Sequence, residues 1–263
     1  MFYEYFGLKN MPFAEQVSPE AMLQDGRFSH GLTRLEYFVA DGSIAVLTGP
    51  TGVGKSSLLR LFASRLPSNR YQVLYLHLTH VGSASLLRMI VTSLGEKPRL
   101  GKDRLFGQIL EKTEASEQTT VLMIDEAHLL TEETLTDLRL LMSAGLNGMP
   151  KLKLVLIGQR GLNNMIARKN LADLVNRITV RYQLFGLTKD QTICYIDHRL
   201  GHAGGGEKLF QEEAKEKIHD YAGGIPRVIN NLATICLIQG AAKKQKRINE
   251  AIVDEAAAEL RVR

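Results

Sequence analysis

The sequence has 263 residues, of which 44% are apolar and 23% charged, and it carries a net charge of +5 and no tryptophan. This composition excludes a disordered or fibrous chain, and the length suits one α/β core with a smaller appended domain. No apolar run approaches the ~18 residues of a membrane-spanning helix, and the N-terminus lacks the pattern of a signal peptide, so we expect a cytoplasmic protein.

Apolar runs rich in β-branched residues recur along the first two thirds of the chain and predict strands. These runs are residues 44–47, 73–78, 120–124, 152–157 and 178–184. Helical spacing occurs between them, at residues 56–66, 83–94, 103–113, 132–141 and 162–168. Strands that alternate with helices predict a doubly wound parallel sheet, which binds its ligands at the carboxyl ends of the strands.

The first strand leads directly into a complete G-x-x-x-x-G-K-[ST] pattern. In such a loop, successive backbone N–H groups converge on a β-phosphate, the lysine reaches the β- and γ-phosphate oxygens, and the serine hydroxyl holds Mg²⁺. The pattern therefore predicts a nucleotide site with a magnesium ion. The nucleotide-binding residues that we expect are Gly49, Pro50, Thr51, Gly52, Val53, Gly54, Lys55, Ser56 and Ser57.

The third predicted strand ends in two adjacent carboxylates, Asp125 and Glu126. We expect Asp125 to contribute to the magnesium and nucleotide site, and Glu126 to orient and deprotonate the attacking water. Side chains alternate along a strand, so the two carboxylates are predicted to lie on different sides. The position of the pair, 70 residues after Lys55, suggests a strand that neighbours the first one in the sheet.

Strand signals stop after Leu187, and helical spacing continues in residues 189–200, 211–221, 227–241 and 249–260. A break at residues 223–226 contains two glycines, which allow positive φ, and Pro226, which can open the next helix. We therefore predict two domains. Residues 1–186 form an N-terminal segment and the nucleotide-binding α/β domain, and residues 187–263 form a helical lid.

These motifs resemble those of AAA+ ATPases in the clade of the ExeA-type secretion ATPases and the transposon target-selection (TnsC/TniB-like) ATPases. The likeness spans almost the whole chain. Beyond the phosphate loop and the Asp125-Glu126 pair, it includes Tyr5-Phe6-Gly7-Leu8, Pro12-Phe13, Leu156-Ile157-Gly158-Gln159 and Gly223-Gly224-Ile225-Pro226-Arg227. The resemblance implies a P-loop NTPase (AAA+) fold, with helices flanking a parallel sheet and a C-terminal all-helical lid. It also implies Mg²⁺-dependent hydrolysis of ATP to ADP and phosphate, in a homo-oligomer that forms a ring or a helical filament.

The same resemblance assigns roles to further polar residues. Gln159 matches the sensor that contacts the γ-phosphate or the attacking water, and a buried turn glutamine is the alternative. Arg227 matches the second sensor, an arginine of the lid, and a cation at a helix start is unfavourable unless an anion lies nearby. Arg177 matches the arginine finger that completes the site of a neighbouring subunit, and Arg181 is its close competitor.

Two interpretations of what the ATPase acts on stay open. In the first, the oligomer forms on double-stranded DNA and recruits a transposase or related partner. The net charge favours this interpretation, as does the end of the sequence at Arg263, because ExeA-type members usually continue into a membrane-spanning segment. In the second, the protein is an accessory ATPase of an envelope secretion or type IV pilus assembly system without a role for DNA, which the N-terminal motif favours.

A basic segment between two predicted helices is the candidate DNA contact. A solvated surface is the alternative for such a cluster. The residues expected to face DNA phosphates are Lys97, Arg99, Lys102 and Arg104.

Overall fold

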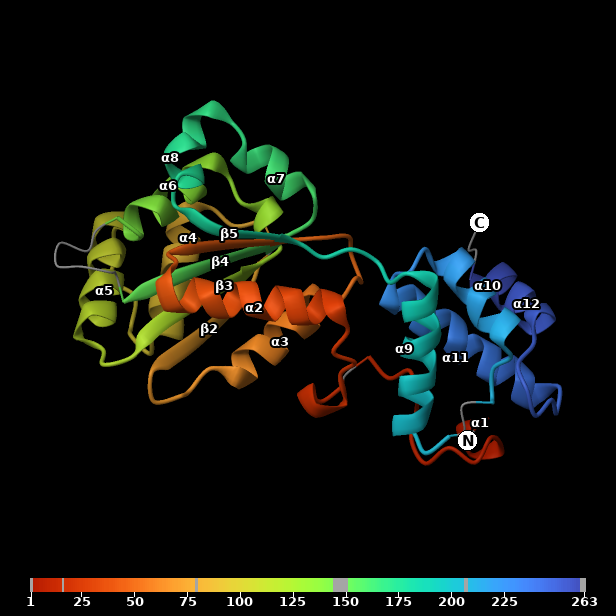
Figure 1. Ribbon diagram of the computed structural model, residues 1–263. Helices are drawn as coiled ribbons and strands as arrows, with labels where there is room; N and C mark the ends of the chain where they lie inside the picture. The colour runs from red at the N-terminus through yellow and green to blue at the C-terminus, as the bar shows by residue number, and fades with distance from the viewer. Residues whose placement is uncertain (1, 16, 79, 144–150, 206–207, 261–263) are drawn as a thin grey trace. The chain divides into compact units, whose positions relative to one another are not determined.

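The structure is a computed structural model that describes residues 2–15, 17–78, 80–143, 151–205 and 208–260 (Figure 1). Contacts divide the chain, as far as it is described, into two compact units. Unit 1 comprises Met1–Gly26, Thr51–Gly54 and Phe185–Arg263, and unit 2 comprises Arg27–Pro50 and Lys55–Leu184. The N-terminal segment, which the sequence groups with the nucleotide domain, therefore lies with the C-terminal helices in the structure.

Within the described part of the chain, unit 2 is built on a five-stranded sheet with the order β2-β3-β4-β1-β5. Each pairing between these strands is parallel. The strands are β1 (Ile44–Thr48), β2 (Tyr71–His77), β3 (Thr119–Asp125), β4 (Leu152–Gly158) and β5 (Ile178–Gln183). The predicted strands and the α/β fold class are confirmed.

The predicted adjacency of the first and third strands is wrong, because β4 lies between β1 and β3. Every residue of β1 and β4 is buried, whereas β2 and β5 contain partly or fully exposed residues as well as buried ones. Strands that are apolar on both faces occupy the centre of a parallel sheet, where helices cover both sides. The number of residues between two strands does not indicate whether they are neighbours in the sheet.

Helices cover both faces of the sheet. Those of unit 2 are α2 (Gly26–Asp41), α3 (Lys55–Arg65), α4 (Ser83–Ser93), α5 (Lys102–Ala115), α6 (Glu132–Leu141), α7 (Gly161–Ile166) and α8 (Ala172–Val175), with the 3-10 turns η2 (Ala127–Leu129) and η3 (Lys169–Leu171). Helix α2 was not predicted from the sequence, although its buried residues Phe28, Leu32, Leu35 and Val39 recur at helical spacing.

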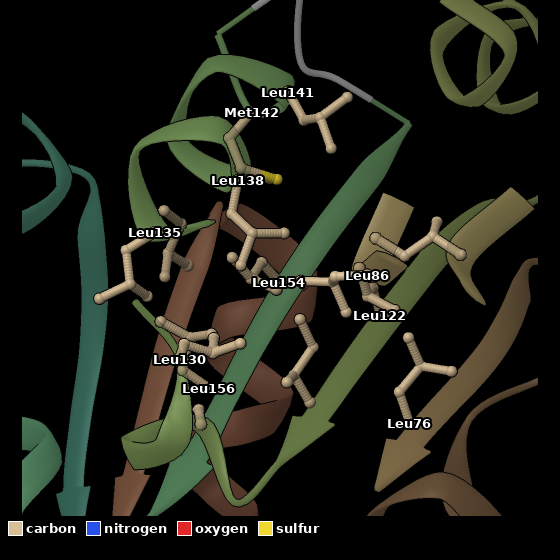
Figure 2. Packing of buried hydrophobic residues seen from close by; sticks show 14 of the residues in the cluster. Leu76, Leu86, Leu122, Leu130, Leu135, Leu138, Leu141, Met142, Leu154 and Leu156 are labelled. Atoms are coloured by element: carbon tan, nitrogen blue, oxygen red, sulfur yellow. The ribbon is translucent and has the colours of Figure 1, made fainter. Parts of the chain in front are cut away.

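One face of the sheet packs against α4 to α8 in a continuous apolar core. Figure 2 shows Leu135 and Leu138 of α6 close to Leu154 and Leu156 of β4. On the opposite face, the ammonium of Lys153 donates hydrogen bonds to the carbonyls of Gly42 (2.7 Å) and Phe38 (3.4 Å), at the end of α2. Burial lowers the pKa of Lys153, and its charge complements the negative end of the helix dipole.

Unit 1 has a core of its own, formed by α9 (Lys189–His202), α10 (Glu212–Ala222), α11 (Pro226–Ala242) and α12 (Glu250–Leu260). The N-terminal segment, with α1 (Phe2–Tyr5) and η1 (Pro19–Ala21), joins this core through Leu8 and Phe13. Arg199 of α9 is buried and donates hydrogen bonds to the carbonyls of Pro12 (2.7 Å) and Ala14 (2.6 Å). These contacts explain why residues 2–15 pack with helices that follow them by some 180 residues.

The break between α10 and α11 follows the expected geometry. Gly223 and Gly224 have φ values of +57° and +71°, which favour glycine. Pro226 occupies the first turn of α11. An N–H group at this position has no partner within the helix, so the lack of one in proline costs no helical hydrogen bond. Among the helices of the described ranges, none combines the length and apolarity that crossing a bilayer requires.

Two leucines of α6 provide a stability test of the core. We expect Leu138→Ala to lower the free energy of unfolding by about 2 to 5 kcal/mol, because it leaves a cavity between α6 and the sheet. The exposed fraction is 2% for Leu138 and 41% for Leu140, so Leu140→Ala on the same helix should cost less than about 1 kcal/mol. Urea denaturation of both variants measures the difference. Equal losses would contradict the packing of α6.

Candidate functional site

The loop between β1 and α3 has the backbone geometry of a phosphate cradle. Gly52 and Gly54 have φ values of +77° and +107°, a region that other residues rarely adopt. The N–H of Gly49 donates a hydrogen bond to the carbonyl of Gly158 at the end of β4 (3.2 Å). The loop then enters α3 at Lys55, and the start of a helix favours an anion because its first N–H groups point toward the ligand and its dipole is positive there.

Lys55 places a positive charge at this helix start. Its exposed fraction is 8%, and its ammonium donates hydrogen bonds to the carbonyls of Gly49 (2.9 Å) and Pro50 (3.0 Å). Desolvation makes a buried cation costly unless its environment compensates it. The loop carbonyls and an anionic ligand at the helix start supply such compensation, as expected for a phosphate site.

Ser56 and Asp125 meet although they lie 69 residues apart in the sequence. The Ser56 hydroxyl donates to Asp125 Oδ2 at 3.3 Å, and Asp125 is 4% exposed at the end of β3. A hydroxyl and one carboxylate are the protein ligands that Mg²⁺ takes together with waters and substrate phosphates. In the described part of the chain, no group of three or more His, Cys, Asp or Glu residues could hold a metal ion. The hydroxyl of Ser56 and the carboxylate of Asp125 fit a magnesium ion that arrives with a nucleotide.

Tyr75 of β2 also contacts Asp125, which sequence analysis did not anticipate. The phenol donates a hydrogen bond to Asp125 Oδ2 at 2.5 Å. Partial burial and the adjacent carboxylate raise the pKa of Tyr75, so the phenol is a hydrogen-bond donor at neutral pH. Nothing in the local pattern separates this tyrosine from an ordinary strand residue.

Glu126 leaves the strand in a left-handed turn. Its φ and ψ are +57° and +31°, an unusual conformation for a residue other than glycine, and such strain is often found at functional sites. Because β3 ends at Asp125, the direction of the Glu126 side chain is set by this turn. Strand alternation, on which the sequence-based expectation relied, does not extend to it.

The Glu126 carboxylate lies beside the imidazole of His128 in η2. Glu126 Oε2 and His128 Nδ1 are 3.2 Å apart, and both atoms are buried. η2 packs closely on the end of β4, since a Cβ added to Gly158 would lie 3.2 Å from the backbone nitrogen of His128. One carboxylate oxygen of Glu126 is therefore buried beside His128, near the strand end that precedes Gln159.

The predicted sensors lie at the ends of their elements. Gln159 is exposed directly after β4, so the alternative of a buried turn glutamine is wrong. Arg227 is in the first turn of α11, and its backbone N–H donates to the carbonyl of Gly52 (3.2 Å), also within unit 1. Its guanidinium lies 3.8 Å from the carboxylate of Glu15. The roles of Gln159 and Arg227 stay predictions.

The two candidate arginine fingers are both exposed. Arg177 follows α8, and Arg181 lies on the edge strand β5. Either position leaves the guanidinium available to a second copy of the chain. The choice between them stays open, as it does in the sequence.

The basic segment is exposed, but part of its charge is compensated. Lys97 and Arg99 precede α5, and Lys102 and Arg104 lie in its first turn. The Lys102 ammonium lies 2.6 Å from the carboxylate of Asp137 and 2.8 Å from that of Glu133, both on α6, and these carboxylates raise the pKa of Lys102. Arg99 lies 4.0 Å from Glu111. DNA contacts by these residues stay a prediction.

Sequence comparison finds a similar family of domains and a homologous protein. Residues 39–166 match the family model described as an AAA domain. The chain is 31% identical to General secretion pathway protein A of Aeromonas hydrophila over 266 residues, which cover 99% of this chain and 48% of that protein. The two proteins are homologous, and this chain spans about half the length of its relative.

Solved structures of similar fold include Cdc6p from Pyrobaculum aerophilum, with a TM-score of 0.75 and 19% identity over 94% of this chain and 70% of that one. The Drosophila ORC bound to DNA has a TM-score of 0.73 and 18% identity, and the match covers 100% of this chain and 66% of that one. At these identities the likeness shows the fold alone. That fold is the P-loop AAA+ fold predicted from the sequence.

Lys55 allows a direct test of the phosphate cradle. We expect Lys55→Ala to weaken the binding of a fluorescent ATP analogue at least about 30-fold, because it removes a buried charge that faces the phosphates. Fluorescence anisotropy measures the dissociation constant. Lys112→Ala removes an exposed lysine paired with Glu96 and is the control that should bind normally. Wild-type affinity in the Lys55 variant would contradict this assignment of the loop.

Proposed function

We propose that this chain, which contains an AAA domain, is a Mg²⁺-dependent ATPase that hydrolyses ATP to ADP and phosphate. The observation that carries the proposal is the meeting of Ser56 and Asp125 (3.3 Å) directly after the glycine loop and Lys55. Glu126 follows Asp125, and its carboxylate takes no part in the contact between Ser56 and Asp125. The contact between Ser56 and Asp125 therefore supports a site in which the phosphate-binding Lys55 and the general base Glu126 lie on either side of the magnesium ligands.

Each group has a distinct part in the proposed reaction. The loop N–H groups and Lys55 hold the β- and γ-phosphates, and Ser56 and Asp125 hold Mg²⁺, which neutralises charge on the phosphate oxygens when it is bound. Glu126 accepts a proton from the attacking water through the carboxylate oxygen that does not face His128. Gln159, exposed at the end of β4, orients this water or the γ-phosphate.

The active form in this proposal is a homo-oligomer, either a ring or a helical filament. Arg177 or Arg181 of one subunit would add positive charge to the site of its neighbour, an effect of about 10³ to 10⁵ in rate for known arginine fingers. The exposure of both side chains supports this arrangement. Arg227 of α11 is the candidate that reports on the γ-phosphate.

An envelope secretion or type IV pilus assembly system is the working context that we favour. The homology to General secretion pathway protein A, over 99% of this chain, supports it. Since the sequence covers 48% of that relative, its end at Arg263 does not discriminate between the two contexts. The partner in this interpretation is a protein of the assembly system.

A DNA-bound oligomer that recruits a transposase-type partner is the second candidate. The net charge of +5 favours it, and the structure of similar fold from Drosophila ORC is bound to DNA. The ion pairs of Lys102 with Asp137 and Glu133 count against it, because they reduce the positive charge that the basic segment offers to phosphates.

Glu126→Gln separates binding from hydrolysis. We expect it to bind ATP with wild-type affinity and to lose turnover by about 10²- to 10⁴-fold, because the amide cannot accept the proton of the water. Phosphate release and anisotropy with a fluorescent ATP analogue measure the two quantities. Glu117→Gln, a carboxylate in the turn before β3, is the control for hydrolysis. Normal turnover in the Glu126 variant would assign the base elsewhere.

A titration of labelled duplex DNA with and without a non-hydrolysable ATP analogue discriminates between the two contexts. For the favoured context, we expect weak binding that does not depend on nucleotide. Binding that requires nucleotide and falls steeply with salt would support the second candidate, because phosphate contacts release counterions. In that case Arg104→Ala should weaken binding about equally for all sequences, whereas Lys112→Ala should not.

A further inference from the structure

We propose that Tyr75 is a positioning residue of the magnesium site, where its hydroxyl keeps the carboxylate of Asp125 turned toward Ser56. The inference rests on the proposed nucleotide site and adds a group on a third element to the pair of ligands.

The place of Tyr75 in its strand is not explained by packing. β2 alternates near its end, so that Leu74 and Leu76 are buried in the core at 7% and 6% exposure, while Tyr75 and His77 point to the other face. The Tyr75 side chain is 47% exposed, although an aromatic ring usually contributes to stability through burial. Its hydroxyl, in contrast, reaches a carboxylate that is 4% exposed.

Both oxygens of Asp125 are occupied by donors in an ordered way. Oδ2 accepts from the Tyr75 hydroxyl (2.5 Å) and from the Ser56 hydroxyl (3.3 Å), and Oδ1 accepts from the N–H of Glu126 (2.8 Å). A carboxylate held by donors at both oxygens cannot rotate without losing hydrogen bonds. The Tyr75 bond is the shortest of the three, so it contributes strongly to the orientation of the group.

Tyr75 reaches Asp125 from the neighbouring strand. In the parallel pairing of β2 with β3, Tyr75 lies opposite Met123 and His77 lies opposite Asp125. The imidazole of His77 is nevertheless 3.9 Å from Asp125 Oδ2 and its side chain is 62% exposed. The longer tyrosine extends along the sheet by two residues and donates the hydrogen bond, whereas His77 stays at a distance beyond hydrogen bonding.

Such a contact has a defined consequence for a metal ligand. Groups that hydrogen-bond to a ligating carboxylate fix its orientation, and their loss typically lowers metal affinity about 10- to 100-fold. The phenol need not touch the ion for this effect. Tyr75 should therefore influence how much Mg²⁺ the nucleotide site requires, and should affect nucleotide binding itself much less.

The test is the Mg²⁺ dependence of nucleotide binding in Tyr75→Phe, which keeps the ring and removes the hydroxyl. A fluorescent ADP analogue is titrated with MgCl₂ and, separately, bound in EDTA. We expect the Mg²⁺ concentration for half-maximal enhancement to rise about 10- to 100-fold, with binding in EDTA unchanged. Tyr71→Phe is the matched control, because Tyr71 lies on the same strand opposite Thr119 at the other end of β3, and it should behave as the wild type.

A second variant excludes a merely structural effect. In an Asp125→Ala background, Tyr75→Phe should change the Mg²⁺ requirement no further, since the carboxylate that it orients is gone. An unchanged Mg²⁺ requirement in Tyr75→Phe, or an equal loss of binding in EDTA, would overturn the inference while leaving the nucleotide site intact. Absence of nucleotide binding in the wild-type protein, with and without Mg²⁺, would instead refute the proposed function.

Discussion

The arrangement of the site depends on one contact across the sheet, in which the hydroxyl of Ser56 reaches the carboxylate of Asp125. Ser56 lies in the first turn of α3, directly after β1 and its loop, and Asp125 ends β3, which β4 separates from β1. They meet because all strands are parallel, so that the carboxyl ends of β1, β3 and β4 lie at one edge. A hydrogen bond from Gly49 to Gly158 joins the loop after β1 to the end of β4. This register places the glycine loop, Asp125 and Glu126, the residues of the proposed ATPase site, at the same edge.

Around this contact, the polar groups form one connected network. Tyr75, Ser56 and the N–H of Glu126 all donate to Asp125, and the imidazole of His128 lies 3.2 Å from the side chain of Glu126. The left-handed conformation of Glu126 is the point at which the network leaves regular strand geometry. Surrounding packing must stabilise such a conformation, because it costs about 1 to 3 kcal/mol. The buried strand β3 and the close packing of η2 on Gly158 supply that stabilisation.

Which working partner the charge favours depends on how far neighbouring carboxylates compensate the basic residues. Net charge and clustered lysines favour a polyanion, but a lysine within 3 Å of two carboxylates contributes less to the local field than its sequence suggests. The 31% identity to General secretion pathway protein A, over 99% of this chain and 48% of that protein, supports the proposed secretion or pilus context. Both proposed contexts would use the same ATPase site, so its motifs do not distinguish them.

The sequence by itself determined the elements whose cause is local. Hydrophobic periodicity located the five strands of unit 2 in the described chain, and the G-x-x-x-x-G-K-[ST] pattern identified the phosphate loop. Asp125 and Glu126 were recognisable because they end a buried strand. Helix α2 was within reach of the same reasoning, since its buried residues follow helical spacing. These features depend on conformational preferences of adjacent residues, which the order of residues encodes directly.

Only the tertiary structure decided which distant segments meet. It placed β4 between β1 and β3, brought Tyr75 to Asp125, paired Lys102 with acids of α6 and packed the N-terminal segment against α9. Each of these contacts joins residues that are far apart along the chain, and each residue has several possible partners in the folded protein. Periodicity and motif spacing describe one segment at a time, so they carry no information about that competition.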